Sequence, residues 1–371
     1  MRLLDRYLLR ELLLPLGYCL GGILVFWISF DLFTELASFQ KDHLTVADVA
    51  AYYSVLLPQL LVLVLPIVLL LGSLYALTNH ARHHELIAIR AAGVGVWRLS
   101  VPYLLVGLVF SLVIFVLNEW FVPPAVPAAE AIRNRHSESP SRAGDQRRLN
   151  VNFVNARDGR IWNIQEYHLE TQEMIRPQVD WQLADGSRRQ ILAERGARTN
   201  GAWAFYDVQE LDYYPGQIGA IPSRIKLLVL PEWSETPERI QSEIKINSLD
   251  SFKRSKKARL SARDIRTYLE WHPRLRAEKK AQLTTLLHSH FATPWTSLVV
   301  VLITLPFGMT SVRRNVFVGV ASSIVICFAY FVLNELCLAL GAGGYVLPWL
   351  AAWLPNLLFG GAGFALTRRL P

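Results

Sequence analysis

Six long apolar stretches constrain this chain more than any other feature of its sequence. About 20 mostly apolar residues allow an α-helix to cross a bilayer, and a helix satisfies its own backbone hydrogen bonds there. The stretches span about 12–36, 52–77, 99–122, 286–309, 316–340 and 345–366. The sequence therefore predicts a polytopic α-helical membrane protein with six transmembrane helices.

Basic residues in the short connections predict how these helices are oriented. Lys and Arg concentrate in short loops on the cytoplasmic side of a membrane. One set of short flanks carries Arg2, Arg6, Arg10, Arg82, Arg90, Arg98, Arg313, Arg314, Arg368 and Arg369. The other short loops carry only Lys41. We therefore expect both termini in the cytoplasm and the long segment 123–281 in the periplasm of a bacterial inner-membrane protein.

The long segment has the pattern of β structure. Segments in which apolar and polar residues alternate flank Asp158-Gly159. Further turn signals come at Asp185-Gly186, Asn200-Gly201 and Pro215-Gly216. Asp-Gly and Asn-Gly pairs supply the positive φ angles that tight hairpins need. Regular recurrence of these pairs favours an antiparallel sandwich or roll.

These patterns predict three parts. They are an N-terminal membrane half at 1–122, a periplasmic β domain with a basic connector at 123–281, and a C-terminal membrane half at 282–371. The connector is rich in Lys and Arg from Lys253 onwards, and we expect it to be partly helical; a solvated linker is the alternative.

Composition narrows the classes of partner. The formal net charge is +8 and 52% of residues are hydrophobic, too many for an ordinary soluble enzyme. In a membrane protein, excess positive charge indicates loop placement and contact with anionic lipid before nucleic acid, so no nucleic-acid partner is expected. Cys19, Cys327 and Cys337 all fall in apolar stretches, which implies no disulfide framework.

The loop between the second and third stretches is the most informative short segment. Leu86 and Ile89 lie at helical spacing, with Glu85 and Arg90 beside them, and Gly93 is placed to end a helix. A short amphipathic helix of this kind can dock into a groove of a soluble partner. An ordinary solvated loop is the alternative.

Several motifs spread along the chain carry a resemblance. They are Asp5-Arg6-Tyr7-Leu8-Leu9-Arg10-Glu11, Glu85-Leu86-Ile87-Ala88-Ile89-Arg90-Ala91-Ala92-Gly93, Asn118-Glu119 with Pro123 and Ala125, Pro294, Leu305-Pro306-Phe307-Gly308 and Trp353-Leu354-Pro355-Asn356. Together they resemble the LptF/LptG family of lipopolysaccharide-export permeases. The segment from Glu85 to Gly93 is the most specific of them.

The resemblance implies a permease subunit of an ABC transporter. Such a permease pairs with a second, similar permease and with two copies of a cytoplasmic ATPase. Its periplasmic domain would be an antiparallel β-jellyroll that hands lipopolysaccharide to periplasmic jellyroll bridge proteins leading to the outer membrane. The chain contains no Gly-x-x-x-x-Gly-Lys-Ser/Thr motif, so we expect it to bind no cofactor, to be no enzyme itself, and to depend on ATP hydrolysed by a partner.

The resemblance also assigns residues to two sites. A coupling helix at about 81–96 would be received by the ATPase through Glu85, Leu86, Ile89, Arg90, Ala91 and Gly93. At the outer mouth of the membrane cavity, Lys41, Arg133 and Arg135 match basic residues that contact lipid, and such cations can neutralise the phosphates of a lipid A head group. Solvation or contact with ordinary phospholipid is the alternative for each of these three.

Four carboxylates in or near the spans allow other hypotheses for the function of the protein. Asp31, Glu35, Glu119 and Glu335 could form the catalytic set of a membrane-anchored enzyme acting on envelope lipid or glycan. We expect instead that they pair with Lys41, Arg133 or a backbone partner. A third possibility is a non-transporting subunit that couples an ATPase to a periplasmic event.

Two histidines lie close together before the fourth apolar stretch. His288 and His290 are two positions apart, so on a helix they point to different faces. We therefore expect them to be structural, and we expect no metal site.

Overall fold

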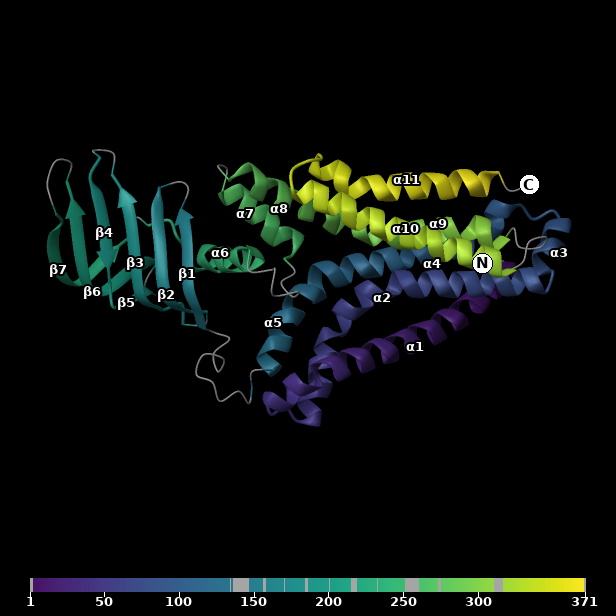
Figure 1. Ribbon diagram of the computed structural model, residues 1–371, viewed down its shortest axis with the longest axis horizontal. Coiled ribbons are helices and arrows are strands. Elements are labelled where there is room, and N and C mark those ends of the chain that lie inside the picture. The colour runs from purple at the N-terminus through teal and green to yellow at the C-terminus, as the bar shows by residue number, and fades with distance from the viewer. Residues whose placement is uncertain are drawn as a thin grey trace. The chain divides into compact units, whose positions relative to one another are not determined.

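A computed structural model describes residues 3–133, 135, 147–155, 158–169, 171–183, 186–199, 201–214, 219–231, 233–250, 260–272, 275–309 and 316–369. The chain forms two compact units. The helical unit comprises 1–129, 261–265 and 276–371, and the β unit comprises 130–260 and 266–275. Their elements are labelled in Figure 1. Several residues used above lie outside the described ranges: Arg2, Asp185, Asn200, Pro215, Gly216, Lys253, Arg313 and Arg314.

Six helices in the described ranges are long and apolar enough to cross a membrane, as the sequence predicts. The helices of this half of the fold are α1 (Leu3–Lys41), α2 (Val46–Arg82), α3 (Glu85–Ala91), α4 (Val96–Val116), the π-helical turn η1 (Leu117–Phe121), α5 (Val122–Arg133), α8 (Ala277–Ala292), the 3₁₀ turn η3 (Thr293–Trp295), α9 (Thr296–Met309), α10 (Val316–Ala342) and α11 (Pro348–Arg368).

Most spans extend beyond their apolar stretches because polar residues continue or cap the helices. At the start of α2, the Thr45 side chain accepts a hydrogen bond from the Asp48 backbone N–H at 3.3 Å. The Asp48 carboxylate accepts one from the Thr45 backbone N–H at 3.1 Å. This capping box satisfies two backbone donors and starts the helix six residues before the apolar stretch.

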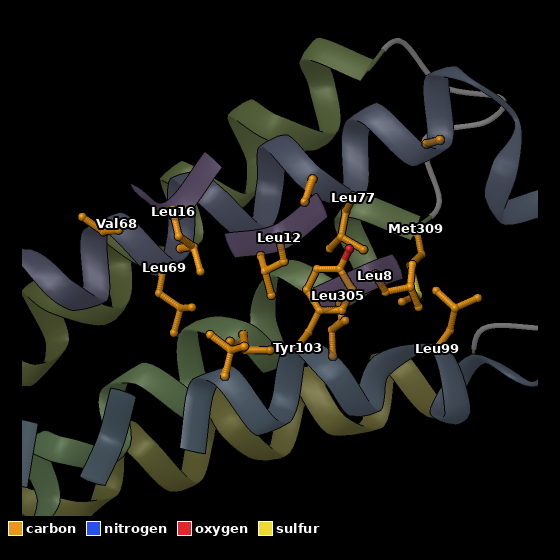
Figure 2. Packing of buried hydrophobic residues seen from close by; sticks show 14 of the residues in the cluster. Leu8, Leu12, Leu16, Val68, Leu69, Leu77, Leu99, Tyr103, Leu305 and Met309 are labelled. Atoms are coloured by element: carbon orange, nitrogen blue, oxygen red, sulfur yellow. The ribbon is translucent and has the colours of Figure 1, made fainter. Parts of the chain in front are cut away.

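The helical unit is built around α2 and α9. Two thirds of the apolar window is buried both in α2 and in the span Ala277–Met309 that α9 completes, whereas α1 buries 17% and α10 buries 22% of theirs. Leucines from α1, α2, α4 and α9 interdigitate around Tyr103, as Figure 2 shows. Glycine allows close approach where the helices cross, since a Cβ on Gly308 would lie 2.7 Å from the Leu77 side chain.

A small polar network joins the last helices. The Tyr330 hydroxyl of α10 donates to Asn356 Oδ1 of α11 at 2.6 Å, and the Asn356 amide donates to the Ala292 carbonyl at 2.8 Å. Thr296 Oγ1 lies 2.8 Å from the same hydroxyl. Hydrogen bonds of this kind hold transmembrane helices together. They matter there because apolar side chains contact lipid as favourably as they contact another helix.

The β unit contains one antiparallel sheet of seven strands. These are β1 (Arg147–Asn155), β2 (Arg160–His168), β3 (Met174–Gln182), β4 (Arg188–Leu192), β5 (Arg195–Thr199), β6 (Ala202–Tyr213) and β7 (Ile221–Leu230), in the order β1-β2-β3-β4-β6, with β5 pairing β3 and β6, and β7 pairing β6. The expected inserted antiparallel β domain is confirmed. Helix α6 (Pro237–Asp250) follows the sheet, and α7 (Ala262–Trp271) is divided between the two units.

Glycines mark the hairpins as the sequence predicts. Gly159, Gly186 and Gly201 have φ angles of 70°, 84° and 82°, in the left-handed region that glycine adopts without steric cost. They lie between β1 and β2, β3 and β4, and β5 and β6. The alternation of buried and exposed residues on β1 and β2 follows from the register that these turns set.

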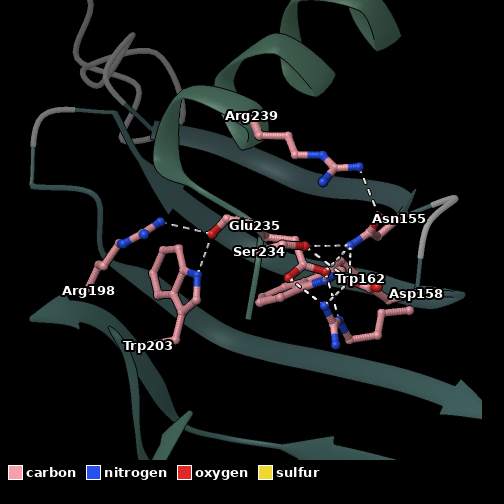
Figure 3. A network of polar contacts seen from close by, with 9 residues as sticks. Asn155, Asp158, Trp162, Arg198, Trp203, Ser234, Glu235 and Arg239 are labelled. Atoms are coloured by element: carbon pink, nitrogen blue, oxygen red, sulfur yellow. Dashed lines mark hydrogen bonds and ion pairs between the residues drawn. The ribbon is translucent and has the colours of Figure 1, made fainter. Parts of the chain in front are cut away.

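The core of the β unit is aromatic and is closed by one buried carboxylate. Trp162, Trp203 and Phe205 are fully buried and pack near Trp233. Glu235 is also fully buried, and its Oε1 accepts from Asn155 at 2.7 Å, Arg160 at 2.9 Å and Trp162 at 3.1 Å. Its backbone carbonyl accepts from Trp203 at 2.6 Å and from Arg198 at 3.0 Å (Figure 3).

Candidate functional site

The short helix α3 is bounded by two residues with positive φ angles. His84, directly before it, has φ 57°, and Gly93, just after it, has φ 83°. The Gly93 N–H donates to the Arg90 carbonyl at 2.9 Å, and the Val94 N–H donates to the Ile89 carbonyl at 3.3 Å. These two bonds form a Schellman motif, which requires the left-handed residue that glycine supplies. Gly93 therefore ends the helix as the sequence predicts.

The apolar face of α3 is turned into the helical unit. Leu86 is only 3% exposed and belongs to the same cluster as Leu8, Leu99 and Met309, and Ile89 packs against that cluster. The opposite face leaves Ile87, Ala88, Arg90 and Ala91 exposed. The two apolar residues selected by helical spacing thus hold α3 to its own chain, and the solvent face consists of other residues.

Glu85 ties three segments together. Its Oε2 accepts a hydrogen bond from the Tyr7 hydroxyl of α1 at 2.9 Å and lies 2.7 Å from Nδ1 of His80 on α2. The rings of Tyr7 and His80 are 5.8 Å apart. We call Tyr7, His80 and Glu85 the Glu85 cluster. It attaches the first turn of α3 to the ends of two spans.

The electrostatics of this cluster favour a charged carboxylate. Partial burial alone would raise the pKa of Glu85, but the hydrogen bonds from His80 and Tyr7 outweigh it and lower that pKa below its ordinary value. His80 is 1% exposed, so its ring has little freedom to leave the carboxylate. Its Nε2 is buried and has no hydrogen-bond partner within the described ranges.

A second ion pair secures the same end of α1. Arg98 Nη2, on the first turns of α4, lies 2.7 Å from Asp5 Oδ2. Asp5 is buried and Arg98 is partly exposed, so solvent screens the charge of Arg98 more than that of Asp5. Together with the Glu85 cluster, it links α1, α2, α3 and α4 around one end of the helical unit.

Sequence reasoning missed Tyr7, His80 and Ile87 as members of this site. The sequence marks Tyr7 only as part of a family motif, and Tyr7 meets Glu85 across 78 positions of sequence. A histidine at the end of an apolar span is a usable signal for His80, because ionisable groups there are costly unless paired. Ile87 lay inside the most specific motif but off its apolar stripe.

The three cations expected to contact lipid occupy helix ends. Lys41 is the last residue of α1 and is exposed, within the helical unit. Arg133 is the last residue of α5 and is half-buried, and Arg135 follows it and is exposed; both belong to the β unit. Arg133 and Arg135 each interact with other residues of the chain. Their shared role in binding lipid stays a prediction.

The carboxylates near the spans have defined surroundings. Glu119 lies in η1 and accepts a hydrogen bond from the Ala262 backbone N–H at 3.2 Å, the kind of backbone partner that we expected. Asp31 instead accepts from the Tyr53 hydroxyl of α2 at 2.9 Å, so the expected cation or backbone partner is corrected to a tyrosine. Glu335 is exposed on α10, and Glu35 interacts with other residues of the chain.

None of the other polar residues in the described ranges gathers into a metal site. No group of three or more His, Cys, Asp or Glu side chains is close enough to hold an ion there. His288 and His290 are half-buried on α8. The three cysteines are free thiols.

These features define a polytopic helical membrane protein with an inserted antiparallel β domain. The family model described as "Lipopolysaccharide export system permease LptF/LptG" matches residues 6–369. The chain therefore belongs to the LptF/LptG family of lipopolysaccharide-export permeases and is a multi-pass inner-membrane protein. No curated protein matches the chain. The family is one of transport permeases, which argues against the alternative of a lipid-modifying or glycan-modifying enzyme.

Proposed function

We propose that this chain is a permease subunit of an ABC transporter that extracts lipopolysaccharide from the inner membrane and passes it to a periplasmic jellyroll bridge. A separate cytoplasmic ATPase dimer supplies the energy, and a second LptF/LptG-type permease completes the membrane part. The observation that carries this proposal is the family match across residues 6–369. The six spans and the inserted β domain are compatible with that role.

The orientation follows from charge. The end of the helical unit that holds α3 also carries Arg6, Arg10, Arg90, Arg98 and Arg368, and basic short loops stay in the cytoplasm. This orientation brings both termini and α3 to the side where ATP is hydrolysed. The β domain then lies in the periplasm, where the lipid is delivered.

We assign the two faces of α3 different tasks in coupling. The exposed face, with Ile87, Arg90 and Ala91, contacts the ATPase. Leu86, Ile89 and the Glu85 cluster hold the helix to α1 and α2, and Gly93 ends it. Closure of the ATPase dimer moves α3, and the ends of the two spans move with it because they share hydrogen bonds and a packed core. That motion narrows the cavity between the two permeases and drives lipid towards the β domain.

Lys41, Arg133 and Arg135 are the residues that we assign to the phosphates of the lipid. Ammonium and guanidinium groups bind phosphate oxygens through charge-assisted hydrogen bonds. Reversing the charge of Lys41 and Arg133 together should lower photo-cross-linking of lipid A by a probe placed beside Lys41. Unchanged cross-linking would remove both residues from the lipid site.

The coupling assignment is tested with variants of the two faces. Ile87→Asp puts a charge on the exposed face and should abolish copurification of the ATPase, whereas Ile87→Leu keeps an apolar side chain and should retain it. Glu85→Gln should leave the ATPase bound but reduce lipopolysaccharide release per ATP hydrolysed, since only the inner attachment is weakened. Full copurification with Ile87→Asp and unchanged export would show that α3 is not the coupling element.

A further inference from the structure

We propose that the β unit carries a binding site for a neutral oligosaccharide, separate from its aromatic core. The site is an open pocket of about 450 Å³ on the sheet. Residues of β1, β2, β3, β4 and β6 line it. This volume falls within the range of typical small-ligand sites.

The pocket lies along a row of residues that crosses the sheet. Pairing of Leu149 with Glu166 and of Val151 with Ile164 sets Asn150 of β1 opposite Gln165 of β2. In the same way, pairing of Glu166 with Ile175 and of Ile164 with Pro177 sets Gln165 opposite Arg176 of β3. The Arg176 N–H donates to the Glu194 carbonyl at 3.0 Å, and the Glu194 N–H donates to the Tyr206 carbonyl, next to Asp207, at 3.2 Å.

Three residues of this row have an unusual backbone. Asn150, Arg176 and Asp207 have φ angles of 54°, 48° and 51°, in the left-handed region that side chains other than glycine seldom enter. All three line the pocket. Strained residues of this kind persist where the surrounding structure holds them, and they cluster at functional sites. Because the three residues lie on three different strands, the geometry of a single turn does not explain their shared conformation.

The side chains of the pocket are mostly amides. Six of the lining residues are Asn or Gln: Asn150, Asn152, Asn163, Gln165, Gln178 and Gln209. Asn is depleted in β-strands, so this concentration is not what strand formation selects. Each amide offers two donors and an acceptor, which matches sugar hydroxyls, because these both donate and accept. Asn163 and Gln178 are direct cross-strand partners and present two amides side by side.

The charges of the pocket argue for a neutral ligand. Its ionisable lining residues are Arg176, Glu194 and Asp207, and Arg176 Nε already lies 3.5 Å from the Glu194 carboxylate. Two acidic groups against one paired cation disfavour a phosphate. An uncharged saccharide segment can hydrogen-bond to the amides and is not repelled by the two carboxylates.

Two sources could present such a saccharide in the periplasm. One is the sugar portion of the exported lipid, in which case the inference also rests on the proposed function. The other is a glycan strand of the cell wall. The chemistry of the pocket is shared between them, and the experiment separates them.

The test uses the full chain in phospholipid nanodiscs and isothermal titration calorimetry. Dephosphorylated core oligosaccharide released from lipopolysaccharide is one probe, and N-acetylglucosamine tetramer is the other. We expect one of them to bind, and the Asn163→Ala/Gln178→Ala variant to weaken that binding about tenfold, since each loses one hydrogen-bonding amide. Binding of only the core oligosaccharide indicates the lipid, and binding of only the tetramer indicates the cell wall.

A matched control lies on the same strand. Gln182 of β3 is exposed, like the pocket amides of β1, β2 and β6, but it does not line the pocket, so Gln182→Ala should bind like the unsubstituted chain. Gln209→Ala, on β6, provides a second pocket variant, and near-ultraviolet circular dichroism checks that each variant is folded. Absence of binding by both probes, or equal losses in the Gln182 and pocket variants, would overturn the site. ATP-dependent lipopolysaccharide release by the assembled transporter would still support the proposed function in that case.

Discussion

The two units of this protein solve the problem of a stable core differently. The cluster of the helical unit drawn in Figure 2 is almost wholly aliphatic, and Tyr103 is the buried aromatic ring among its described residues. The core of the β unit is dominated by Trp162, Trp203, Phe205 and Trp233 and is closed by the buried Glu235. Helices in lipid satisfy their own backbone and associate by close packing, because lipid is as apolar as leucine.

The β unit must instead exclude water from a small core. Large aromatic side chains bury about 150–250 Å² each, so a few residues supply much of the apolar burial. They also bring indole N–H groups that need acceptors, and Glu235 provides them with its carboxylate and its carbonyl. The stability of the helical unit should therefore be sensitive to changes in side-chain shape, and that of the β unit to the loss of one polar group.

The largest effect is expected at Glu235. Glu235→Ala leaves the Arg160 guanidinium, the Asn155 amide and the Trp162 indole without their shared acceptor, and removing one partner of a buried ion pair typically costs about 3–5 kcal/mol. Near-ultraviolet circular dichroism of the full chain should show the tryptophan core melting at lower denaturant concentration, with the helical signal retained. Glu173→Ala, in an exposed pair with Arg195, should melt like the unsubstituted chain. Equal stability of the two variants would refute the role of Glu235.

An intermediate effect is expected from shape alone in the helical unit. A Cβ on Gly363 of α11 would lie 2.7 Å from the Leu302 carbonyl oxygen of α9, so Gly363→Ala should force the helices apart at a cost of about 1–3 kcal/mol. Gly361→Ala is the matched control, since its added methyl group meets nothing within 4 Å. Thermal unfolding in detergent compares the two. If both variants unfold at the same temperature, close packing of α9 and α11 does not limit the stability of the helical unit.

The smallest effect concerns the attachment of α3. Because the pKa of Glu85 is lowered in the folded protein, its hydrogen bonds contribute stability above the ordinary carboxyl pKa, and this contribution is lost as pH falls through the lowered value. Tyr7→Phe removes one donor, so the pH at which α3 loosens should rise by several tenths of a unit to about one unit.

A spin label attached through Ile87→Cys reports this loosening as increased mobility during an acid titration. Tyr18→Phe is the control, because Tyr18 lies on the same helix with its side chain exposed. An unchanged titration in Tyr7→Phe would mean that the Glu85 cluster does not hold α3. The same measurement in Glu85→Gln should show little dependence on pH in this range.

Much of the architecture could be predicted because its physical cause is local. A stretch such as 52–77 is apolar enough to cross a membrane whatever its neighbours are, and it became part of α2. Asp158-Gly159 turns the chain between β1 and β2 because glycine reaches positive φ on its own. Gly93 ends α3 for the same reason.

The partners of individual side chains could not be predicted in this way. The sequence by itself determined the spans, the inserted β domain and the end of α3 at Gly93, since each depends on a few consecutive residues, whereas the helix expected at about 81–96 is shorter in the structure, at Glu85–Ala91. Only the tertiary structure decided that Leu86 faces inward, that Glu85 meets Tyr7 and His80, and that amides from separate strands line one pocket. Those contacts join residues far apart in the chain, and the packing of whole elements, rather than local preference, brings them within reach.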